Sequence, residues 1–344
     1  MGIEEHPDVP LRRRRNRRRT VLFVVLGLFL VAALVSVGFI ANLGRSFDTQ
    51  TVKIPTAFPA ETLRPEKPVQ GPAANAVNIL LLGSDSRGDG LNLAEQGTAS
   101  DQRSDTMLWV HIPADRKNIF LMSVMRDTWV NIPGYGEAKI NAAMAFGGVP
   151  LVVETLEGMF GSRIDHVAIV DFEGFKAITN ALGGVEVDVP LAFTTMDGNF
   201  TFSAGPQKLD GDQALAFVRE RYAFSDGDYQ RVKDQQIFLK AVLSGILSPA
   251  TLSNPLKVND LVNQVSPYIS VDTGLTSATV GALAVSLKSV SGSDVHSFTL
   301  PTLGTGTSAD GQSIVIKDDA AIAAISQALK DDTLATYLAG AGLG

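Results

Sequence analysis

The segment His166–Val189, HVAIVDFEGFKAITNALGGVEVDV, decides the fold class of this 344-residue chain. Its first five residues, His166 to Val170, are mostly apolar, which is typical of a buried strand. Phe172 to Leu182 carries apolar residues at helical spacing, and Gly183-Gly184 predicts a turn into Val185–Val189, where apolar and acidic residues alternate. A strand, a helix and a strand in succession predict an α/β (α+β) domain whose central sheet is covered by helices.

Similar elements are predicted on both sides of this segment. Short apolar runs predict strands over Asn78–Leu82, Met107–Ile112, Ile119–Val124 and His296–Leu300. Helical spacing predicts helices over Val149–Phe160, Gly211–Val218 (capped by Asp210), Tyr229–Leu247, Pro255–Val265, Leu275–Leu287 and Asp319–Leu329, with Pro255–Val265 and Leu275–Leu287 amphipathic. Asn199–Ser203 is expected to form an exposed hairpin arm, and Thr302–Ser313, TLGTGTSADGQS, a mobile loop. The mixed sheet, with helices on both faces, is expected to occupy residues 77–335.

The N-terminus has the pattern of a membrane anchor. Residues 1–20 hold seven arginines against three acidic residues, although the whole chain has a net charge of −7. Val21–Ala41, VLFVVLGLFLVAALVSVGFIA, is uncharged and, at about 1.5 Å per residue, long enough to cross a hydrocarbon core of roughly 30 Å. A cleaved signal peptide has a shorter apolar core and a small-residue cleavage site, so an uncleaved single-pass transmembrane helix is favoured. The positive-inside rule then places residues 1–20 in the cytoplasm and the domain outside the cell membrane.

Composition narrows the function further. The chain contains no cysteine, which excludes disulfides, thiolate metal sites and a thiol nucleophile. The exterior part is acidic, so nucleic acid is not expected as a partner. Residues 42–76 are rich in Pro, Thr and Ala and are expected to form an extracytoplasmic stalk, with the alternative that part of them packs on the domain as an edge segment. Residues 336–344 are expected to be a flexible tail.

An arginine-rich stretch, LAFVRERYAFSDGDYQRVKDQQ over Leu215–Gln236, is the first candidate site. If the chain is extended at Arg219 and Arg221, both side chains leave the same face and the intervening glutamate leaves the other. Arg231 and Gln235 are four residues apart in a predicted helix and share a face. Arginine forks match phosphate oxygens, so their convergence predicts a pyrophosphate site; the alternative is a set of solvated salt bridges.

Two aspartates at predicted strand ends form a second candidate. Asp85 follows a buried strand within GSDSR, and Asp105 precedes the next strand within RSDT, with Arg87 and Arg103 nearby. Carboxylates from adjacent strand ends hold Mg²⁺ together with substrate phosphates, whereas the alternative is a pair of turn or capping aspartates.

The third predicted strand ends in Arg126-Asp127, and Lys139 is expected to open the next helix. The charged pair is either a structural ion pair or part of the same site, and Lys139 is either an ordinary helix start or a support. The sequence contains no zinc-protease, nucleophile-elbow or phosphate-loop motif. With only two tryptophans in the chain, no aromatic platform for sugar stacking is expected.

Taken in order, these motifs resemble those of the LytR-CpsA-Psr family of cell-wall ligases. The matching stretches are NILLLGSDSR, RSDTMLWVHI, SVMRDTWVNIPG with GEAKINAA, IDHVAIVDFEGFKAITNALGGVEVDV, and LDGDQALAFVRERY with DYQRVKDQQ. They cover roughly Asn78 to Gln236, and the remainder to Asp331 fits the end of the same domain.

The resemblance implies an α/β/α fold that binds a polyprenyl pyrophosphate and transfers its glycopolymer to a peptidoglycan hydroxyl, leaving a phosphodiester link. By position, it implies metal binding (Mg²⁺ or Mn²⁺) by Asp85 and Asp105, and pyrophosphate binding by Arg126, Arg219, Arg221, Arg231 and Gln235. It implies supporting roles for Arg87, Arg103, Asp127 and Lys139. Two departures from the family pattern are Met125, where proline is common, and Asp234, where arginine is frequent.

The implied mechanism is phosphoryl transfer by positioning and charge stabilisation. Mg²⁺ and the four arginines, Arg126, Arg219, Arg221 and Arg231, would neutralise the pyrophosphate and stabilise the departing polyprenyl phosphate. Either Asp105 or Asp127 would take the proton. Ile237, Phe238, Ala241 and Val242 either line an apolar slot for the lipid or belong to the core. The alternatives are a lipid-pyrophosphate hydrolase, a non-catalytic wall-polymer or lipid-binding scaffold, and a transcriptional attenuator, against which the topology argues. Teichoic acid, capsular polysaccharide and arabinogalactan remain open as the polymer, with a composition-based lean toward arabinogalactan or another wall polysaccharide.

Overall fold

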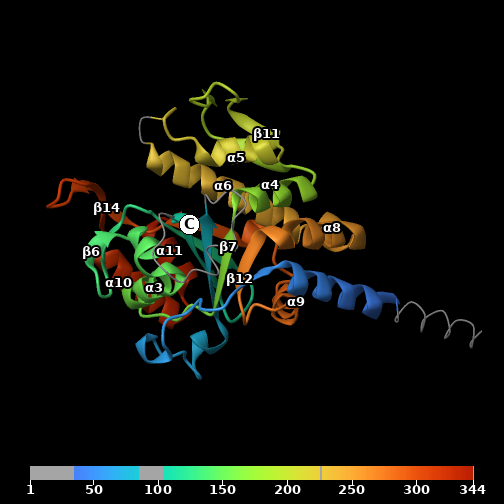
Figure 1. The fold of residues 1–344 in the computed structure, drawn as a ribbon, viewed down its shortest axis with the longest axis horizontal. Helices are drawn as coiled ribbons and strands as arrows, with labels where there is room; N and C mark the ends of the chain where they lie inside the picture. The colour runs from blue at the N-terminus through green and yellow to red at the C-terminus, as the bar shows by residue number, and fades with distance from the viewer. Residues whose placement is uncertain (1–34, 85–103, 225–226, 344) are drawn as a thin grey trace, which may run out of the picture. The chain divides into compact units, whose positions relative to one another are not determined.

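The computed structural model describes residues 35–84, 104–224 and 227–343 (Figure 1). The chain divides into two compact units, Met1–Arg45 and Ser46–Gly344, and the second contains the domain. Residues 35–50 are helical, but most of the predicted membrane span, residues 21–34, lies outside the described residues. Among the described residues, one helix is long and apolar enough to cross a membrane, Ala142–Phe160, and it is a largely buried core helix.

The described part of the domain is built on a seven-stranded mixed sheet with the order β1-β12-β7-β2-β3-β4-β13. The strands are β1 (Val52–Ile54), β12 (Ile269–Asp272), β7 (His166–Val170), β2 (Val77–Ser84), β3 (Ser104–Ile112), β4 (Ile119–Val124) and β13 (Val295–Thr299). β2 runs parallel to β7 and antiparallel to β3, and β4 is antiparallel to β3 and parallel to β13. The carboxyl ends of β2, β4, β7 and β13 therefore meet at one end of the sheet.

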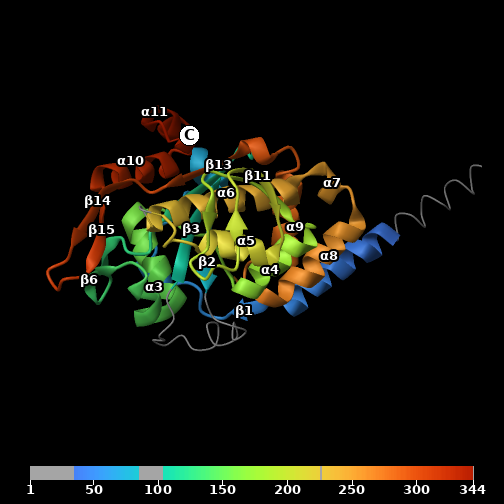
Figure 2. The same ribbon diagram turned by 90° about the horizontal axis from the view of Figure 1, so that it is seen from above.

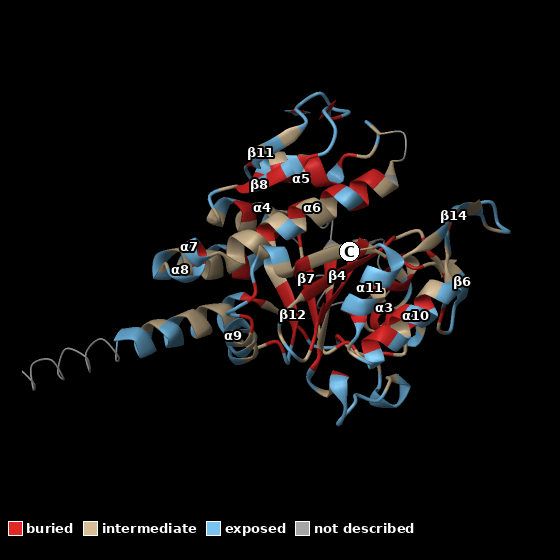
Figure 3. Ribbon diagram, turned by 180° about the vertical axis from the view of Figure 1, so that it is seen from behind, coloured by how far each residue is buried: buried red, intermediate tan, exposed pale blue. Residues whose placement is uncertain are grey.

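Helices cover both faces of the sheet, as the sequence predicts (Figure 3). Alternate residues of β2 point to opposite faces. Leu80 and Leu82 pack with α3 (Ala142–Phe160), α10 (Asp319–Lys330) and α11 (Leu334–Ala341). Leu81 belongs to the other face, which is covered by α6 (Asp228–Leu247) and α9 (Ser277–Ser286), with α4 (Phe172–Ala181) and α5 (Gly211–Arg219) packed beyond α6. The short helix α7 (Pro249–Leu252) and α8 (Pro255–Val265) follow α6.

Small two-stranded sheets surround this framework among the described residues. They are β8 (Val185–Val189) with β11 (Gly205–Leu209), β9 (Phe193–Thr194) with β10 (Thr201–Phe202), β5 (Trp129–Ile132) with β6 (Gly136–Lys139), and β14 (Thr302–Thr307) with β15 (Ser313–Lys317). The predicted hairpin arm near Asn199 is confirmed by β9 and β10. The prediction of a mobile loop over Thr302–Ser313 is wrong, because β14 and β15 pair there as a hairpin. Its Gly and Ser residues indicate a loop locally, but the threonines pair across strands.

The boundaries predicted for the domain are too narrow at both ends. Val52–Ile54 pairs in parallel with β12 at the sheet edge, so the stalk prediction is wrong for this segment and the edge-segment alternative is confirmed. Arg64 is held in the domain by the buried carboxylate of Glu157. The predicted flexible tail is also wrong, because α11 occupies Leu334–Ala341 and buries Leu338. A strand of three residues beside prolines leaves too weak a pattern for sequence-based prediction.

Two helix predictions also change. α3 begins at Ala142, before the predicted Val149, and it bends at Gly147 and Gly148 just ahead of Pro150. The predicted amphipathic helix over Leu275–Leu287 is shorter, with no buried residue of its own in α9, and is preceded by the unpredicted strand β12.

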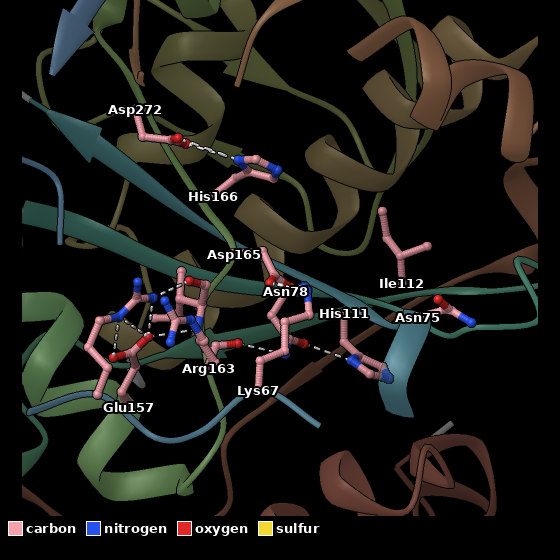
Figure 4. A network of polar contacts seen from close by, with 12 residues as sticks. Lys67, Asn75, Asn78, His111, Ile112, Glu157, Arg163, Asp165, His166 and Asp272 are labelled. Atoms are coloured by element: carbon pink, nitrogen blue, oxygen red, sulfur yellow. Dashed lines mark hydrogen bonds and ion pairs between the residues drawn. The ribbon is translucent and has the colours of Figure 1, made fainter. Parts of the chain in front are cut away.

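A polar network closes the end of the sheet where β2 and β7 begin (Figure 4). The side-chain amide of Asn78 donates to the carbonyl oxygen of Arg163 at 2.8 Å, and its oxygen accepts from Trp109 Nε1 at 3.1 Å. The same oxygen lies 2.8 Å from His111 Nδ1. His111 Nε2 lies 3.1 Å from Asp332 Oδ1, which joins the turn between α10 and α11 to the sheet.

Further ion pairs complete this closed end. Arg64 donates to both oxygens of Glu157, with a shortest distance of 2.6 Å, and both side chains are at least 95% buried. Asp272 accepts from the Val167 N–H at 2.9 Å and lies 3.2 Å from His166 Nδ1. Burial alone would raise the pKa of Asp272, but the hydrogen bonds from His166 and the backbone outweigh it and lower that pKa. The charges of Arg64, Glu157 and Asp272 are therefore partnered within the protein.

Candidate functional site

A cavity of about 410 Å³ opens at the other end of the sheet, where β2, β4 and β7 end. It lies between the sheet face that carries Leu81 and Leu108 and the helices α4, α5 and α6. Its lining contains a group of charged and polar side chains, and the remaining side chains are mostly apolar. Such a lining suits a ligand with a polar end and an apolar end.

Arginines predicted from the sequence meet at this cavity. Arg126 follows β4, Arg219 is the last residue of α5, Arg221 lies just beyond it, and Arg231 and Gln235 lie on α6; all five line the cavity. Arg231 is 8% exposed. Several positive charges around one concave surface attract an anion, and their guanidinium forks suit phosphate oxygens.

The end of α5 orients two of these arginines. Asp210 begins the helix with a capping box in which it exchanges hydrogen bonds with Gln213, as the predicted cap requires. The helix ends at Arg219, so the expectation of an extended chain through Arg219 and Arg221 is wrong. Both arginines nevertheless line the cavity, because the chain turns sharply after the helix.

Glu220 holds that turn. It is 7% exposed, and its carboxylate accepts from the backbone N–H groups of Arg221, Tyr222, Ala223 and Met196 at 2.7–3.1 Å. Burial would raise the pKa of Glu220, but these backbone donors outweigh burial and lower it. Glu220 therefore stays ionised and fixes the backbone from which Arg221 extends.

Aromatic rings orient the guanidinium groups further. The Arg219 guanidinium lies 4.5 Å from the centre of the Phe172 ring, and that of Arg221 lies 4.4 Å from the centre of the Tyr222 ring. Arg221 also donates to the Tyr222 hydroxyl. Stacking uses the flat face of a guanidinium and leaves its N–H edge directed sideways, the orientation that binds phosphate.

One face of α6 supplies both ends of the cavity. Arg231, Gln235, Phe238, Leu239 and Val242 all line it, at spacings of three or four residues. The polar members come first and the apolar members last, over roughly 16 Å of helix. Among residues proposed for an apolar slot, Phe238 and Val242 line the cavity, whereas Ile237 and Ala241 pack against the neighbouring hydrophobic cluster.

Asp127 and Lys139 lie beside the arginines. Lys139 Nζ is 3.3 Å from Asp127 Oδ1, and Arg126 Nε is 3.8 Å from Asp127 Oδ2. Arg126 and Asp127 both line a small hollow next to the main cavity. Lys139 ends strand β6 and does not open a helix, so that expectation is wrong; the helix begins three residues later.

The predicted metal ligands lie largely outside the described residues. Asp85, Arg87 and Arg103 are not described, and for Asp105 only the backbone is, within β3. Gly83 and Thr106 are paired across β2 and β3 and both line the cavity. Gly83 and Thr106 are thus the described cavity residues nearest in the chain to the predicted metal ligands. Among the described side chains there is no cluster of three or more metal-ligating residues.

Asp171 is a cavity residue that the sequence analysis missed. It caps α4 by accepting the Gly174 N–H at 2.7 Å, and it is 9% exposed. Burial raises the pKa of Asp171 above its usual value, although the hydrogen bond from the Gly174 N–H lowers it and offsets part of this effect. The sequence signal for Asp171 is its position between a predicted strand and a predicted helix. That position indicates an N-terminal helix cap and does not indicate a cavity.

Asp234, a departure from the pattern that the family resemblance implies, has an internal partner in the structure. It is fully buried and accepts from the Gln230 side chain at 2.8 Å. Two residues on, Gln236 donates to Ser123 and Thr299, both at 3.0 Å, and so fastens α6 to the ends of β4 and β13. These contacts hold the arginine-bearing turn of α6 against the sheet.

The fold and the cavity define a class of protein: a three-layer α/β domain with a basic site above an apolar pocket. The LytR_cpsA_psr family model matches residues 47–331, and the chain belongs to this family. The resemblance drawn from the sequence motifs is thereby confirmed.

Named relatives agree with this assignment. The polyisoprenyl-teichoic acid–peptidoglycan teichoic acid transferase TagU of Enterococcus faecalis is 32% identical over 319 residues, which cover 92% of this chain and 98% of that protein. The crystal structure of Bacillus subtilis TagV aligns with a TM-score of 0.64 and 25% identity, covering 75% of this chain and 97% of TagV. A structure of TagT bound to LI-WTA has a TM-score of 0.60 and 25% identity, covering 80% and 98% of the two chains.

Proposed function

We propose that this protein is a phosphotransferase that moves a glycopolymer from a polyprenyl-pyrophosphate carrier to a hydroxyl of peptidoglycan. The observation that carries the proposal is the lining of one cavity by arginines at one side and apolar side chains at the other. That order matches a lipid pyrophosphate, which joins a dianionic head to a hydrocarbon chain. The transferase named among the relatives acts between a polyisoprenyl-linked polymer and peptidoglycan, which supports the same assignment.

The polyprenyl chain would lie along the apolar half of α6, beside Phe238, Leu239 and Val242. Its pyrophosphate would then lie against Arg231 and Gln235 at the start of the same face. Arg126, Arg219 and Arg221 would neutralise the remaining phosphate oxygens. Such positioning and charge neutralisation are the main protein contributions to phosphoryl transfer.

In the reaction, a sugar hydroxyl of peptidoglycan attacks the phosphorus nearest the glycan. The bridging P–O bond breaks, polyprenyl phosphate leaves, and the glycan phosphate becomes a phosphodiester. The arginines stabilise the charge on the departing phosphate. Asp127 or Asp105 accepts the hydroxyl proton; in the structure Asp127 is oriented by Lys139.

A Mg²⁺ ion, or Mn²⁺, bound by Asp85 and Asp105 with Arg87 and Arg103 nearby is part of the proposal. Bound there, it would neutralise charge on the pyrophosphate. The cavity position of Gly83 and Thr106 supports this location for the ligands.

We also place the protein in the cell membrane, with residues 1–20 in the cytoplasm, a single span over residues 21–41, and the domain outside. The arginine cluster beside an uncharged apolar run supports this topology. A reporter fused to the C-terminus that is active only outside the cytoplasm is expected; cytoplasmic activity would overturn it.

The activity is tested with the full-length protein in detergent micelles, Mg²⁺ and a polyprenyl-pyrophosphate-linked oligosaccharide, with and without uncross-linked peptidoglycan. A transferase releases polyprenyl phosphate and forms a glycan–peptidoglycan phosphodiester only when the acceptor is present. Release of glycan phosphate regardless of acceptor indicates a hydrolase, and no release under either condition indicates a scaffold. Chelation with EDTA is expected to abolish transfer and to be reversed by Mg²⁺.

A further inference from the structure

Trp129, Asn131 and Glu137 on the outward face of the β5–β6 hairpin have no role in the transfer chemistry above, although this face begins beside Asp127 and the arginines. Trp129 lies opposite Lys139 in this hairpin, and Asn131 lies opposite Glu137. The alternate residues of β5 are buried in the core. Because side chains alternate along a strand, these four residues share the outward face. Asn131 and Glu137 are exposed, and Trp129 and Lys139 are half-buried.

This face combines an aromatic ring with polar groups at its edge. Trp129 Nε1 donates to Glu137 Oε2 at 3.2 Å, which holds the indole across the hairpin in one orientation. A sugar ring presents C–H groups on its faces and hydroxyls around its edge. The face of an indole packs against the C–H groups of a sugar, and a carboxylate and an amide bind its hydroxyls. The expectation that the chain has no aromatic platform came from counting rings, which does not reveal how two strands arrange polar groups around one of them.

The hairpin face is continuous with the candidate site. Lys139 Nζ contacts Asp127 Oδ1 at 3.3 Å, and Asp127 lines the small hollow together with Arg126 and Arg231. Arg126 also lines the main cavity and therefore stands between the apolar pocket and the hairpin. A ligand on the hairpin reaches the arginines through Asp127.

The β14–β15 hairpin borders the same face. Thr128 and Val315 form a parallel bridge, and the Val315 N–H donates to the Asp127 carbonyl oxygen at 2.9 Å. Both bridge residues are buried, so the next residue of each strand, Trp129 and Ile316, turns outward. Ile316 is 39% exposed. β15 packs beside β5, and Figure 2 shows the two hairpins on the same side of the molecule, so the platform has an apolar border on this side.

The geometry of displacement distinguishes the two glycans of the reaction. An entering oxygen attacks phosphorus from the side opposite the leaving group. The leaving polyprenyl phosphate belongs to the side of the apolar pocket. The hairpin lies beyond Arg126 and Asp127 as seen from that pocket, so a hydroxyl held on the hairpin would approach from the side opposite the leaving group.

We propose that the outward face of β5–β6, with Trp129 as its platform and Asn131 and Glu137 as its polar edge, binds the sugar chain of the peptidoglycan acceptor. This inference rests on the proposed transferase function. It assigns the acceptor, and not the lipid-linked donor, to this surface.

Binding is measured first, because it requires no turnover. The chain has two tryptophans, and Trp109 is 1% exposed in the core, so a ligand-induced change in fluorescence reports mainly on Trp129. Uncross-linked peptidoglycan strands are expected to change the emission of the full-length protein and to leave that of Trp129→Phe unchanged. If the wild-type emission does not respond, or if the lipid-linked donor alone produces the same change, the assignment is wrong.

Kinetics then separate acceptor from donor. With saturating donor, Trp129→Leu is expected to raise KM for peptidoglycan about tenfold, while Trp129→Phe restores most of the affinity. Asn131→Ala and Glu137→Gln raise the same KM by smaller factors, and KM for the donor stays unchanged in all of them. Glu186→Gln, an exposed glutamate on β8, is the matched control. An increase in the donor KM, or an unchanged acceptor KM in the folded Glu137→Gln variant, would refute the proposal. If the wild type transfers nothing but still binds peptidoglycan in the fluorescence assay, the transferase function fails and the binding surface stands.

Discussion

The two ends of the central sheet use the same kinds of charged side chains for opposite purposes. Where β2 and β7 begin, Arg64 is buried against Glu157, and His111 contacts Asp332. Where the same strands end, Arg219 packs on an aromatic ring at the wall of a cavity. An arginine that faces a buried carboxylate stabilises the fold, whereas an arginine held on a ring beside a cavity is positioned for a ligand. The residue type is the same, and the partner decides its role.

Topology explains why the arginine-lined cavity lies at this end of the sheet. β2, β4, β7 and β13 run in the same direction, so their following loops gather at a single end of the sheet. The opposite end receives the segment before β2 and the turn between α10 and α11, which bring Arg64 and Asp332 to it. The comparison can be tested by changing each end separately.

The largest effect is expected from removing an arginine at the cavity. Arg219→Ala should lower kcat/KM for transfer about 1,000-fold, since an arginine that stabilises a phosphoryl-transfer transition state contributes on that order. Its unfolding temperature should stay close to that of the wild type. Arg163→Ala at the closed end, which removes a surface pair with Glu61, is the matched control and should keep full activity. Equal losses of activity in both variants would remove the distinction between the two ends.

The reverse result is expected for the buried pair. Glu157→Gln leaves the Arg64 guanidinium, 5% exposed, without its counter-charge and should destabilise the domain by about 3 kcal/mol. The folded fraction should keep a normal kcat, because the pair lies away from the cavity. Urea unfolding measures the first quantity and assays well below the unfolding midpoint measure the second. A large loss of kcat with unchanged stability contradicts the structural role.

Filling the apolar half of the cavity should affect the lipid and not the chemistry. Val242→Trp places a large ring where the polyprenyl chain is proposed to lie, so KM for a long-chain donor should rise roughly tenfold, a loss comparable to about two buried CH₂ groups. A donor with a short prenyl chain should be much less affected. Val280→Trp, on the exposed helix α9, is the control. An equal effect on both donors would mean that the lipid lies elsewhere.

The smallest effect expected is a pH dependence from the closed end. Burial would raise the pKa of Asp332, but hydrogen bonds from His111 and the Ala114 N–H outweigh it and lower that pKa. A carboxyl group whose pKa is lowered in the folded state stabilises the fold at pH values above its unfolded-state pKa of about 3.9. This stabilisation is lost as the pH falls through the folded-state pKa. When the pH is lowered from about 5 to about 3, the unfolding temperature of Asp332→Asn should fall by a few degrees less than that of the wild type, as measured by thermal unfolding. A parallel loss in both proteins would exclude Asp332 as a contributor.

Much of the fold could be predicted because its signals are local. The limits of β4, β7 and β8 were predicted to the residue, and Asp210 was identified as the cap of α5, since apolar alternation and caps depend only on neighbours. β1 and β12 were missed, because a strand of three or four residues is specified by the strand beside it. The hairpin β14–β15 resembles a loop in sequence because of its Gly and Ser residues, and its strands are defined by pairing with each other.

The candidate site shows the same division. The arginines of the LAFVRERY and DYQRVKDQQ stretches could be selected from their chemistry and order, and the structure brings them together at one cavity. The route by which Arg219 and Arg221 reach it was mispredicted, because the turn depends on Glu220 accepting the N–H of Met196, 24 residues away. Asp171 was overlooked because a capping aspartate looks the same in sequence whether or not a cavity opens beside it.

The sequence by itself determined the α/β class, the family and the residue types able to bind a pyrophosphate, because these follow from local periodicity and from motifs in a fixed order. Only the tertiary structure decided that the arginines share a cavity with the apolar face of α6, that Arg64 pairs with a glutamate 93 residues away, and that Trp129 lies beside Asp127 and Lys139. Those contacts depend on strand order and on how helices pack across the sheet. Both are set by the burial of residues distant in the chain, which no local pattern records.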